Sequence, residues 1–514
     1  MLTSILNLVG KDFLTASQGY SIELNDMHGK PKASWVYAEN DALPISGIEY
    51  KYLCEKYGAD AFRLTNEAMV VSPDGSSQMK TIGLEYDFIT DFREAHTDAT
   101  NYGIDLNLDL TNAVPAVLPI TSFYPRYTNM ETRFRSAVVT KVINRYGILS
   151  ETIAHDLGST VSTENVAYDS ETGLLLLTKT KNEFEDDVYS FNYPAHWYYE
   201  SMGQAYKNLG LRFENLSVNS AGVATLTNAA DYFVPGDEFI INNNQKGWVI
   251  NVTGNQVSFV NEMGTPLKPG TIYKELVITR SGRRNIIGLS MGSVVSQYNP
   301  LNQLQQNKFN KVISATNQLF RDDWRTFCEC YFDENSPLKH SKNPYAIGQK
   351  GTWRPFKSFA FLVDREHSYK NNNTNIRKDG LYKQYNPFWT YNGLSWGIDL
   401  NNWTWTSEIT DYNPYGAAIE NRDALNRYSA SLYGYSNTIP TAIAGNAKYR
   451  EIAYDGFEDY NFNSCSKQHF GYKNFKDSIV KYKAHTGTRS IHVNADTAFV
   501  NKQLNPCLPY EKFR

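Results

Sequence analysis

Two apolar spacings occur in the first hundred residues. In the segment 45–64, apolar residues recur near the helical period, at Ile48, Tyr52, Leu53 and Tyr57. In the segment 79–92, MKTIGLEYDFITDF, apolar and polar residues alternate. The first spacing is typical of an amphipathic helix, and the second of a strand with one covered face. We therefore expect residues 1–100 to form a small α+β region.

From residue 101 to residue 210 the pattern predicts strands joined by turns. The segment 134–149 is rich in β-branched residues of alternating polarity. The sequence YDSETG that begins at Tyr168 is typical of a turn, and a second strand-like run, LLLLTKTKNEF, follows it. We expect a β-hairpin that turns between Asp169 and Gly173.

The next stretch predicts a small domain of short strands. Between residues 231 and 267, apolar runs alternate with Gly, Asn and Pro turns at a spacing of roughly ten residues. This spacing is the signal for a small barrel or sandwich. We expect residues 211–275 to form an inserted, barrel-like β domain.

Residues 276–455 predict a mixed, aromatic-rich domain. In the segment 301–332, apolar residues fit one or two helices, at Phe309, Val312, Ile313, Leu319 and Phe320. The segment 385–406, YNPFWTYNGLSWGIDLNNWTWT, is instead typical of strands.

A second helix is expected in the segment 421–442, NRDALNRYSASLYGYSNTIPTA. Asn421 suits the N-cap position, and Gly434 suits the helix end. Leu425, Tyr428 and Leu432 would form one apolar face. After Gly434 we expect a tyrosine-rich turn.

Composition strengthens the β prediction. Aromatic residues make up 14% of the 514 residues, while only 8 are Met. Tyr, Phe and Trp favour half-buried pleated surfaces and contact faces. The chain is also long enough for several domains. We expect a β-rich multidomain protein with a minor α+β part, built from small barrels or sandwiches.

Net charge and hydropathy limit the classes of partner that the sequence predicts. The net charge of -4 gives no support for nucleic-acid binding by bulk charge, so we expect no sequence-specific nucleic-acid partner. No window approaches the roughly 20 apolar residues that a membrane-spanning helix needs. The start, where Lys11 and Asp12 interrupt a short apolar run, does not resemble a signal peptide. We expect no membrane span.

One sequence motif matches a nucleophile elbow. GLSMG, from Gly288 to Gly292, has the form G-x-S-x-G, which would make Ser290 a nucleophile if a strand preceded it and a helix followed. The residues that follow are β-branched and soon meet Pro300, which makes a helix unfavourable. We favour a serine in a strand turn.

Two groups of residues contain side chains of the types that metal binding or acid–base chemistry uses. Soft metal ligands occur at Cys328, Cys330, Cys465 and His469, but their spacing is not that of a zinc finger. Free thiols, or a disulfide between Cys465 and Cys507, are the alternative, and with Cys54 the cysteine count is odd.

The second group is an acidic run ahead of a histidine. Its carboxylates are Glu183, Glu185, Asp186 and Asp187. The run lacks the glycine of a calcium loop, so a solvated turn is favoured. We expect His196 to pack against Trp197, because no carboxylate is spaced in sequence to orient it as a base. We therefore assign no catalytic, cofactor-binding or metal-binding residue and expect no enzyme.

Three blocks of the chain carry a family resemblance. They span residues 136–210, 343–365 and 412–462, and they contain SAVVTKVINRYGIL, NPYAIGQKGTWRPF and NPYGAAIENRDALNRY. Together they resemble the muzzle-type tail proteins of crAss-like bacteriophages and long, β-rich surface proteins of Bacteroidetes. The resemblance covers roughly residues 100–500 and is attached to no known chemistry, so it implies architecture and no catalytic residue.

A further phrase lies near the end of the chain. AHTGTRSIHV, residues 484–493, resembles a strand of jelly-roll, carbohydrate-binding-like modules. Such a module needs about eight strands, and only some 55 residues follow Asp459. We therefore expect residues 456–514 to be the start of a jelly roll that stops inside the domain, with Arg514 at a position that suits a trypsin-like cut.

The phage resemblance implies a virion protein of the tail. Its copies would form a homo-oligomeric ring, for which six-fold symmetry is one arrangement, that closes or gates the tail and contacts other tail proteins and a host-surface glycan or protein. The alternative is a bacterial cell-surface scaffold or adhesin. That protein would bind glycans through exposed tryptophans, at Trp389, Trp396, Trp403 and Trp405. If the protein is not a glycan binder, these side chains belong to the core and to interfaces.

Overall fold

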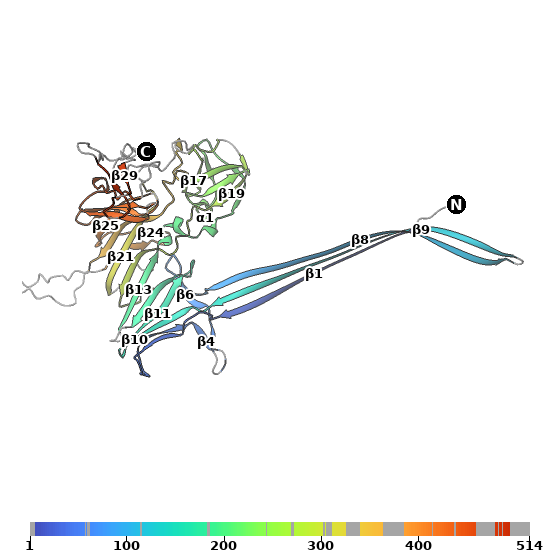
Figure 1. The fold of residues 1–514 in the computed structure, drawn as a ribbon, viewed down its shortest axis with the longest axis horizontal. Helices are drawn as coiled ribbons and strands as arrows, with labels where there is room; N and C mark the ends of the chain where they lie inside the picture. The colour runs from blue at the N-terminus through green and yellow to red at the C-terminus, as the bar shows by residue number, and fades with distance from the viewer. Residues whose placement is uncertain are drawn as a thin grey trace, which may run out of the picture. The chain divides into compact units, whose positions relative to one another are not determined.

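The regular secondary structure of the described residues is almost entirely β-strand, which confirms the expected β-rich multidomain fold (Figure 1). In the described residues the longest helix is α1 (Ala229–Tyr232), and none of the described helices has the length and hydropathy to cross a bilayer. The structure is a computed structural model that describes residues 6–56, 58, 62–113, 116–181, 186–242, 244–268, 272–301, 304, 311–324, 340–362, 385–413, 415–435, 438–458, 478–481, 483–485 and 487–493.

Contacts divide the chain into two units. The first combines Met1–Ala68 with Met79–Ser159, and the second combines Met69–Gln78 with Thr160–Arg514. The segment Met69–Gln78 of the second unit includes most of the short strand β6 (Glu67–Val71) and the start of β7 (Ser77–Thr81). These two strands pair with each other.

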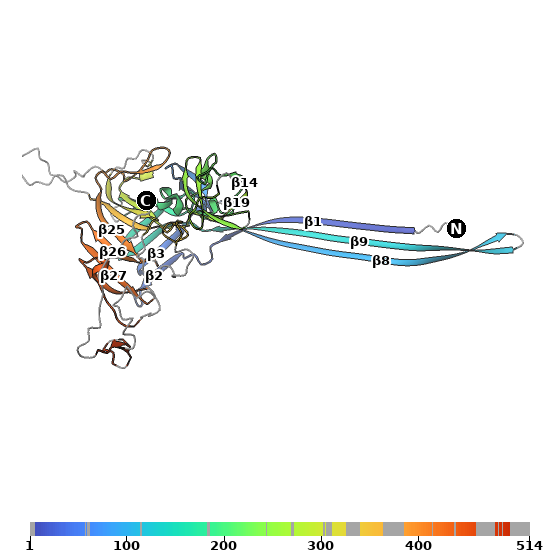
Figure 2. The same cartoon turned by 90° about the horizontal axis from the view of Figure 1, so that it is seen from above.

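A long three-stranded sheet dominates the first unit (Figures 1 and 2). Its central strand is β9 (Ala116–Tyr146), with β1 (Leu6–Asp26) on one side and β8 (Leu84–Ala113) on the other. The strand β1 runs parallel to β9 at a constant offset of 120 residues, whereas β8 and β9 form one antiparallel hairpin. We call these three strands the ribbon.

The remainder of the first unit contains three neighbouring antiparallel strands and a short hairpin. The three strands are β2 (Ala33–Tyr37), β3 (Pro44–Tyr52) and β10 (Leu149–Asp156), and the hairpin joins β4 (Cys54–Lys56) to β5 (Phe62–Leu64). The helix expected within residues 45–64 is therefore wrong over the described residues. Ile48, Tyr50 and Tyr52 also repeat with a period of two, and pairing of β3 with strands on both sides favours that period over the helical one.

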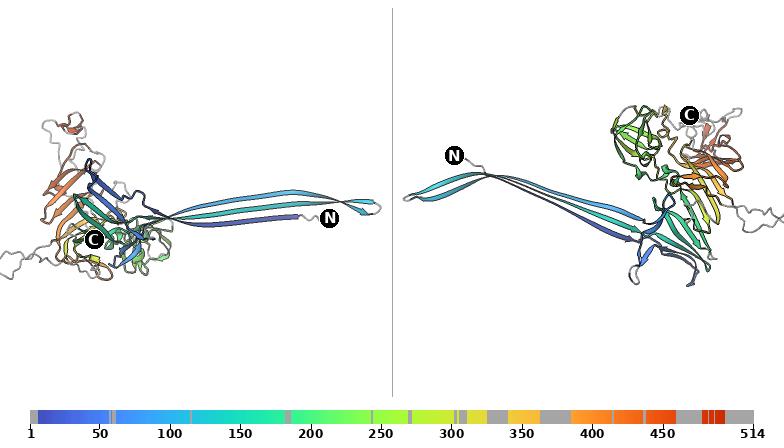
Figure 3. Two further views of the ribbon diagram at one scale, coloured as in Figure 1. Left: turned by 90° about the horizontal axis from the view of Figure 1, so that it is seen from below. Right: turned by 180° about the vertical axis from the view of Figure 1, so that it is seen from behind.

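The second unit contains a large antiparallel sheet (Figure 3). The hairpin expected at Asp169–Gly173 is the turn between its first two strands. Its strands, in spatial order, are β11 (Ser159–Asp169), β12 (Leu175–Lys181), β13 (Asp187–Pro194), β20 (Ser290–Ser296), β21 (Val312–Arg321), β22 (Arg354–Phe361), β25 (Thr404–Tyr412), β26 (Ala418–Asp423), β27 (Tyr428–Gly434) and β28 (Ile439–Gly445).

This sheet overturns two helix predictions. Residues 312–321 of the segment 301–332 form β21, while Phe309 lies outside the described residues. The segment 421–442 contains the end of β26, all of β27 and the start of β28.

A local turn explains the second error. The carboxylate of Asp423 accepts hydrogen bonds from the backbone N–H groups of Leu425 and Arg427, and Asn426 adopts a left-handed conformation with φ of 63°. These contacts close a hairpin, because Asn tolerates the left-handed region and Asp bonds the backbone ahead of it. Leu425 is therefore an exposed turn residue and not part of an apolar helix face.

A separate six-stranded sheet forms its own core. Its order is β14 (Arg212–Ser217), β19 (Ile272–Arg280), β16 (Glu238–Ile241), β17 (Gln245–Thr253), β18 (Gln256–Asn261) and β15 (Val223–Thr225). Phe233, Phe239 and Phe259 lie at the centre of that core. The sheet is nearly closed, and β19 continues past residue 275, where the small β domain was expected to end.

The proposed division into five domains stays a prediction. Strands from two of the expected ranges pair directly, since β13 of the range 101–210 lies beside β20 of the range 276–455. Of the range 456–514, the structure describes one small pair of strands, β29 (Ile479–Val480) and β30 (Ser490–Ile491), so the expected jelly roll is not tested.

Candidate functional site

A buried ionisable cluster lies at the turn between β11 and β12. The carboxylate of Asp169 accepts hydrogen bonds from the indole of Trp197 at 2.8 Å and from the N–H and hydroxyl of Thr172 at 2.8 and 2.7 Å. Nε2 of His196 lies 3.3 Å from the same carboxylate, and both side chains are buried. Both His196 and Trp197 belong to the short helix η1 (Ala195–Trp197).

Electrostatics in this cluster favour a structural role. Burial alone would raise the pKa of Asp169, but the imidazole of His196 and the hydrogen bonds from Thr172 and Trp197 hold that pKa below its ordinary value. The expectation that no carboxylate orients His196 is wrong, because Asp169 reaches it from 27 residues away. Among the described residues, the hydrogen-bond donors to Asp169 come from the turn itself or from η1, so the cluster fixes a corner of the sheet.

The G-x-S-x-G motif does not form a nucleophile elbow. Ser290 begins the strand β20, and the residues after it continue in that strand instead of a helix. Its hydroxyl donates to the carbonyl of Gly292 at 2.7 Å and lies 3.1 Å from the carbonyl of Tyr193. The serine thus bonds the backbone at the edge of a register shift between β13 and β20.

The expected glycan-binding tryptophans are packed against the protein. Trp389 and Trp396 are buried, and Trp403 and Trp405 are partly buried against the same core. All four indole N–H groups donate to backbone carbonyls, of Met291, Pro73, Asn386 and Ser407 respectively. These four residues therefore do not form the exposed row of tryptophans that glycan binding would use.

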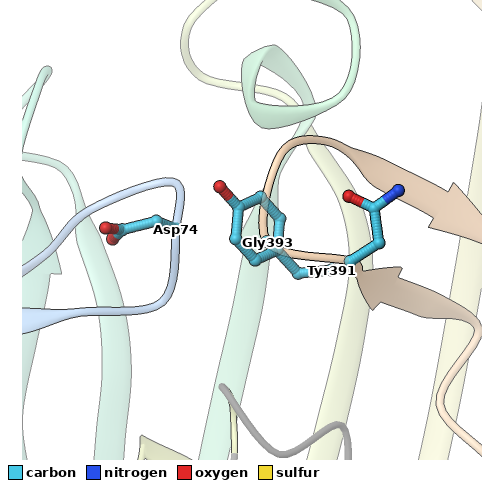
Figure 4. Close-up of a pocket in the computed structure, with 4 residues that line it drawn as sticks. Asp74, Tyr391 and Gly393 are labelled. Atoms are coloured by element: carbon cyan, nitrogen blue, oxygen red, sulfur yellow. The ribbon is translucent and has the colours of Figure 1, made fainter.

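One open recess of about 490 Å³ lies beside this core (Figure 4). It is lined by Asp74, on the turn between β6 and β7, and by Tyr391, Asn392 and Gly393, on the hairpin between β23 (Trp389–Tyr391) and β24 (Trp396–Ile398). The hydroxyl and backbone N–H of Ser76 hold the pKa of Asp74 below its ordinary value. The carboxylate of Asp74 thus accepts hydrogen bonds from within its own turn.

Most residues of the predicted cysteine and acidic groups lie outside the described residues. The residues concerned are Cys328, Cys330, Cys465, His469, Cys507, Glu183 and Glu185. Cys54 is an exposed free thiol on β4, and Asp187 begins β13. Within the described ranges, no three His, Cys, Asp or Glu side chains gather in a way that could hold a metal ion.

The ribbon is the feature that sets this chain apart from an ordinary soluble fold. Large apolar side chains are exposed along all three of its strands, including Phe13, Leu14 and Phe92. Extended apolar surfaces of this kind mark interaction sites, because water covers them at a cost in free energy. We identify the ribbon as the candidate functional site.

Unbroken pairing sorts the ribbon's side chains onto two faces. Because successive residues of a strand point to opposite sides, the odd residues of β8 share a face with the even residues of β1 and β9. We call this the acidic face. Its charged side chains are Asp12, Glu85, Asp87, Asp91, Asp105 and Asp109, against Arg93 and Arg126.

The opposite face, which we call the ion-paired face, is nearly neutral. Glu94 lies 3.2 Å from Arg135, Lys11 lies 3.6 Å from Glu131, and Arg145 pairs with Glu23. Rings and cations also stack here, with Lys141 over Tyr86 and Arg133 over Phe13. Since these pairs are half exposed, each contributes only about 0–1 kcal/mol. The described residues of the ribbon thus form ion pairs at the surface but no covered hydrophobic core.

Beyond the end of β1, the β8 strand of the β8–β9 hairpin is amphipathic. On β8 the ion-paired face presents Ile104, Leu106, Leu108 and Leu110, and Asp105, Asn107 and Asp109 alternate with them. Leu106 is 73% exposed and Leu108 60% exposed. Sequence reasoning missed these residues, although the period-two run IDLNLDL is the local signal for a strand with one face to cover.

No model of a known protein family matches this chain, and no curated protein matches its sequence. The geometry of the ribbon, together with the block resemblance, is therefore the basis on which a function can be argued.

Proposed function

We propose that the chain is a structural virion protein at the distal end of a bacteriophage tail, and not an enzyme. Copies of it form a ring that closes or gates the tail and contacts the host surface. The observation that carries this proposal is the ribbon, whose exposed apolar side chains lie on both faces of a single layer of sheet. Among the described residues of its unit, no second layer covers this sheet, so association between copies supplies the cover.

The interior of the second unit supports a structural role. Its buried Asp169 is used to fix a turn, its Ser290 bonds strand backbone, and its tryptophans fill the core. An enzyme would instead direct a nucleophile, a base and an orienting group toward a shared space. The open recess at Asp74 and Tyr391 does not gather such groups (Figure 4).

The placement in a phage tail is supported by the sequence blocks that resemble muzzle-type proteins of crAss-like phages. The acidic face of the ribbon is also compatible with a wall along which DNA passes. Binding of DNA by counterion release needs clustered Lys and Arg, and acidic side chains outnumber basic ones on that face.

The test is imaging and mass measurement of the native assembly. Gold-labelled antibody raised against the second unit should mark the free end of the tail in negative-stain images of the phage. The detached assembly should have the mass of a closed ring of identical copies. Label on a bacterial envelope, with none on phage tails, would contradict the proposal.

A further inference from the structure

The two outer strands of the ribbon have unpaired edges within the described residues. Each of β1 and β8 has β9 as its one neighbour in that sheet, so one side of each strand presents backbone N–H and C=O groups to solvent. Such edges are templates for pairing with another chain. The free edge of β1 is 21 residues long, and that of β8 is 30 residues long.

Proline marks which edge is closed to pairing. Beyond β1, the strand β9 is itself an edge, and Pro119 and Pro125 both lie in that part. Pro125 directly precedes Arg126, the first residue of β9 that β1 covers. Proline has no N–H to donate, so it prevents ladder formation on that side. Neither β1 nor β8 contains a proline.

The directions of the two free edges are complementary. Because β1 is parallel to β9 and β8 is antiparallel to it, β1 and β8 run in opposite directions. If the β8 edge of one copy meets the β1 edge of the next, the two strands pair antiparallel and all ribbons point the same way. A repeated contact of this head-to-tail kind closes into a ring when its rotation closes.

The size of such a contact suits a stable interface. A ladder of 21 residues is about 70 Å long at the usual rise per residue. It engages roughly the 20–30 residues on each side that specific interfaces use. It also places the exposed apolar side chains of β1 beside those of β8 on both faces.

We propose that neighbouring copies of this chain join through their ribbons, with the free edge of β8 in one copy hydrogen-bonded antiparallel to the free edge of β1 in the next, to give a continuous closed sheet. The partner is a second copy of this chain. The inference rests on the ring of the proposed function and adds the surface that closes it.

The geometry offers a test by disulfide scanning. Within one copy β9 separates β1 from β8 by two strand spacings, about 9.5 Å, which exceeds the roughly 7 Å between Cα atoms that a disulfide can bridge. A disulfide between β1 and β8 therefore has to join two copies. The variant Ser17→Cys is combined with single cysteines along β8 from Phe88 to Thr100, in a chain whose five native cysteines are replaced by serine.

The matched control lies in the same strand. Ser17 is on the ion-paired face, as are the even-numbered residues of β8 such as Thr90, whereas Thr97 and the other odd-numbered residues are on the acidic face. We expect mild oxidation to give covalent dimers and higher multimers with even-numbered partners near one register, and at least tenfold less with odd-numbered partners.

Two results would overturn the inference. If rings form but no even-numbered position cross-links at any register, or if even and odd positions react alike, then another surface joins the copies and the proposed ring remains. If the protein is monomeric by mass and no position cross-links, the edge pairing is wrong. Label at the tail tip is a separate measurement, so the failure of the phage assignment is recognised independently.

Discussion

The indole of Trp197 donates a 2.8 Å hydrogen bond to the carboxylate of Asp169, and both side chains are buried where η1 meets the turn between β11 and β12. Replacing Asp169 by Ala leaves Trp197 and the backbone N–H of Thr172 without their acceptor. Each unpaired buried donor costs about 1–3 kcal/mol, so we expect a clear loss of unfolding free energy in urea. Asp169→Asn keeps an acceptor oxygen and should lose less; equal losses would contradict this role.

The same carboxylate makes a contribution to stability that depends on pH. Because the pKa of Asp169 is held below its unfolded value of about 3.9, the ionised form stabilises the fold above that pH. This contribution is lost as the pH falls through the lower folded pKa. The difference in unfolding free energy between the wild type and Asp169→Asn should thus shrink as the pH falls below about 4. A difference that grows on acidification would contradict the assignment.

The two glycines of the G-x-S-x-G motif should respond differently to alanine. A Cβ on Gly292 would clash with the side-chain oxygen of Asn317 and lie 3.1 Å from the indole nitrogen of Trp389, whereas a Cβ on Gly288 meets nothing within 4 Å. We expect Gly292→Ala to lower the midpoint of thermal unfolding by several degrees and Gly288→Ala to leave it nearly unchanged. Similar effects at both glycines would show that the motif is not packed in this way.

Ser290→Ala serves as the test of the nucleophile interpretation. The hydroxyl bonds the carbonyl of Gly292, so its removal should cost about 1 kcal/mol and leave assembly intact. Loss of a hydrolytic activity in this variant, with unchanged unfolding, would support catalysis instead.

The amphipathic hairpin predicts a contrast between neighbouring residues. Leu106 lies on the ion-paired face and Asn107 on the acidic face. If association of copies covers the leucine row, Leu106→Lys should lower the fraction of assembled protein at least tenfold, measured by mass at micromolar concentration. Asn107→Lys adds the same charge one residue away and should assemble like the wild type. Equal loss in both variants would point to charge alone as the cause.

Local signals predicted part of this fold. The turn at Asp169–Gly173 has polar turn residues between two strand-like runs, and the alternation in the segment 79–92 continues into β8. The helix expected from Leu425, Tyr428 and Leu432 was wrong because one turn residue and two residues of β27 happened to match a spacing of three to four. The side chain of Asp423 and the left-handed Asn426 determine the chain direction there.

Contacts between residues that are far apart in the sequence could not be predicted from local sequence patterns. Asp169 and His196 meet through the folding of β11, β12 and β13, and no spacing rule connects them. The pairing of Leu6 with Arg126 gives no signal near either residue. The alternation of Ile104, Leu106 and Leu108 with acidic residues was visible, but its meaning depends on the absence of a covering layer in the ribbon.

The constant offset between β1 and β9 also determines the order in which the ribbon is made. Residues of β9 leave the ribosome 120 positions after their partners in β1, whereas Ala113 of β8 and Ala116 of β9 are paired three residues apart. The β8–β9 hairpin therefore forms from residues that are close in sequence. Until β9 is synthesised, β1 stays unpaired, with no proline and with apolar side chains such as Phe13 and Leu14. During that interval β1 can pair with other nascent chains. Expression at low temperature, or together with a chaperone that binds residues 6–26, should therefore raise the fraction of the protein that reaches the folded state.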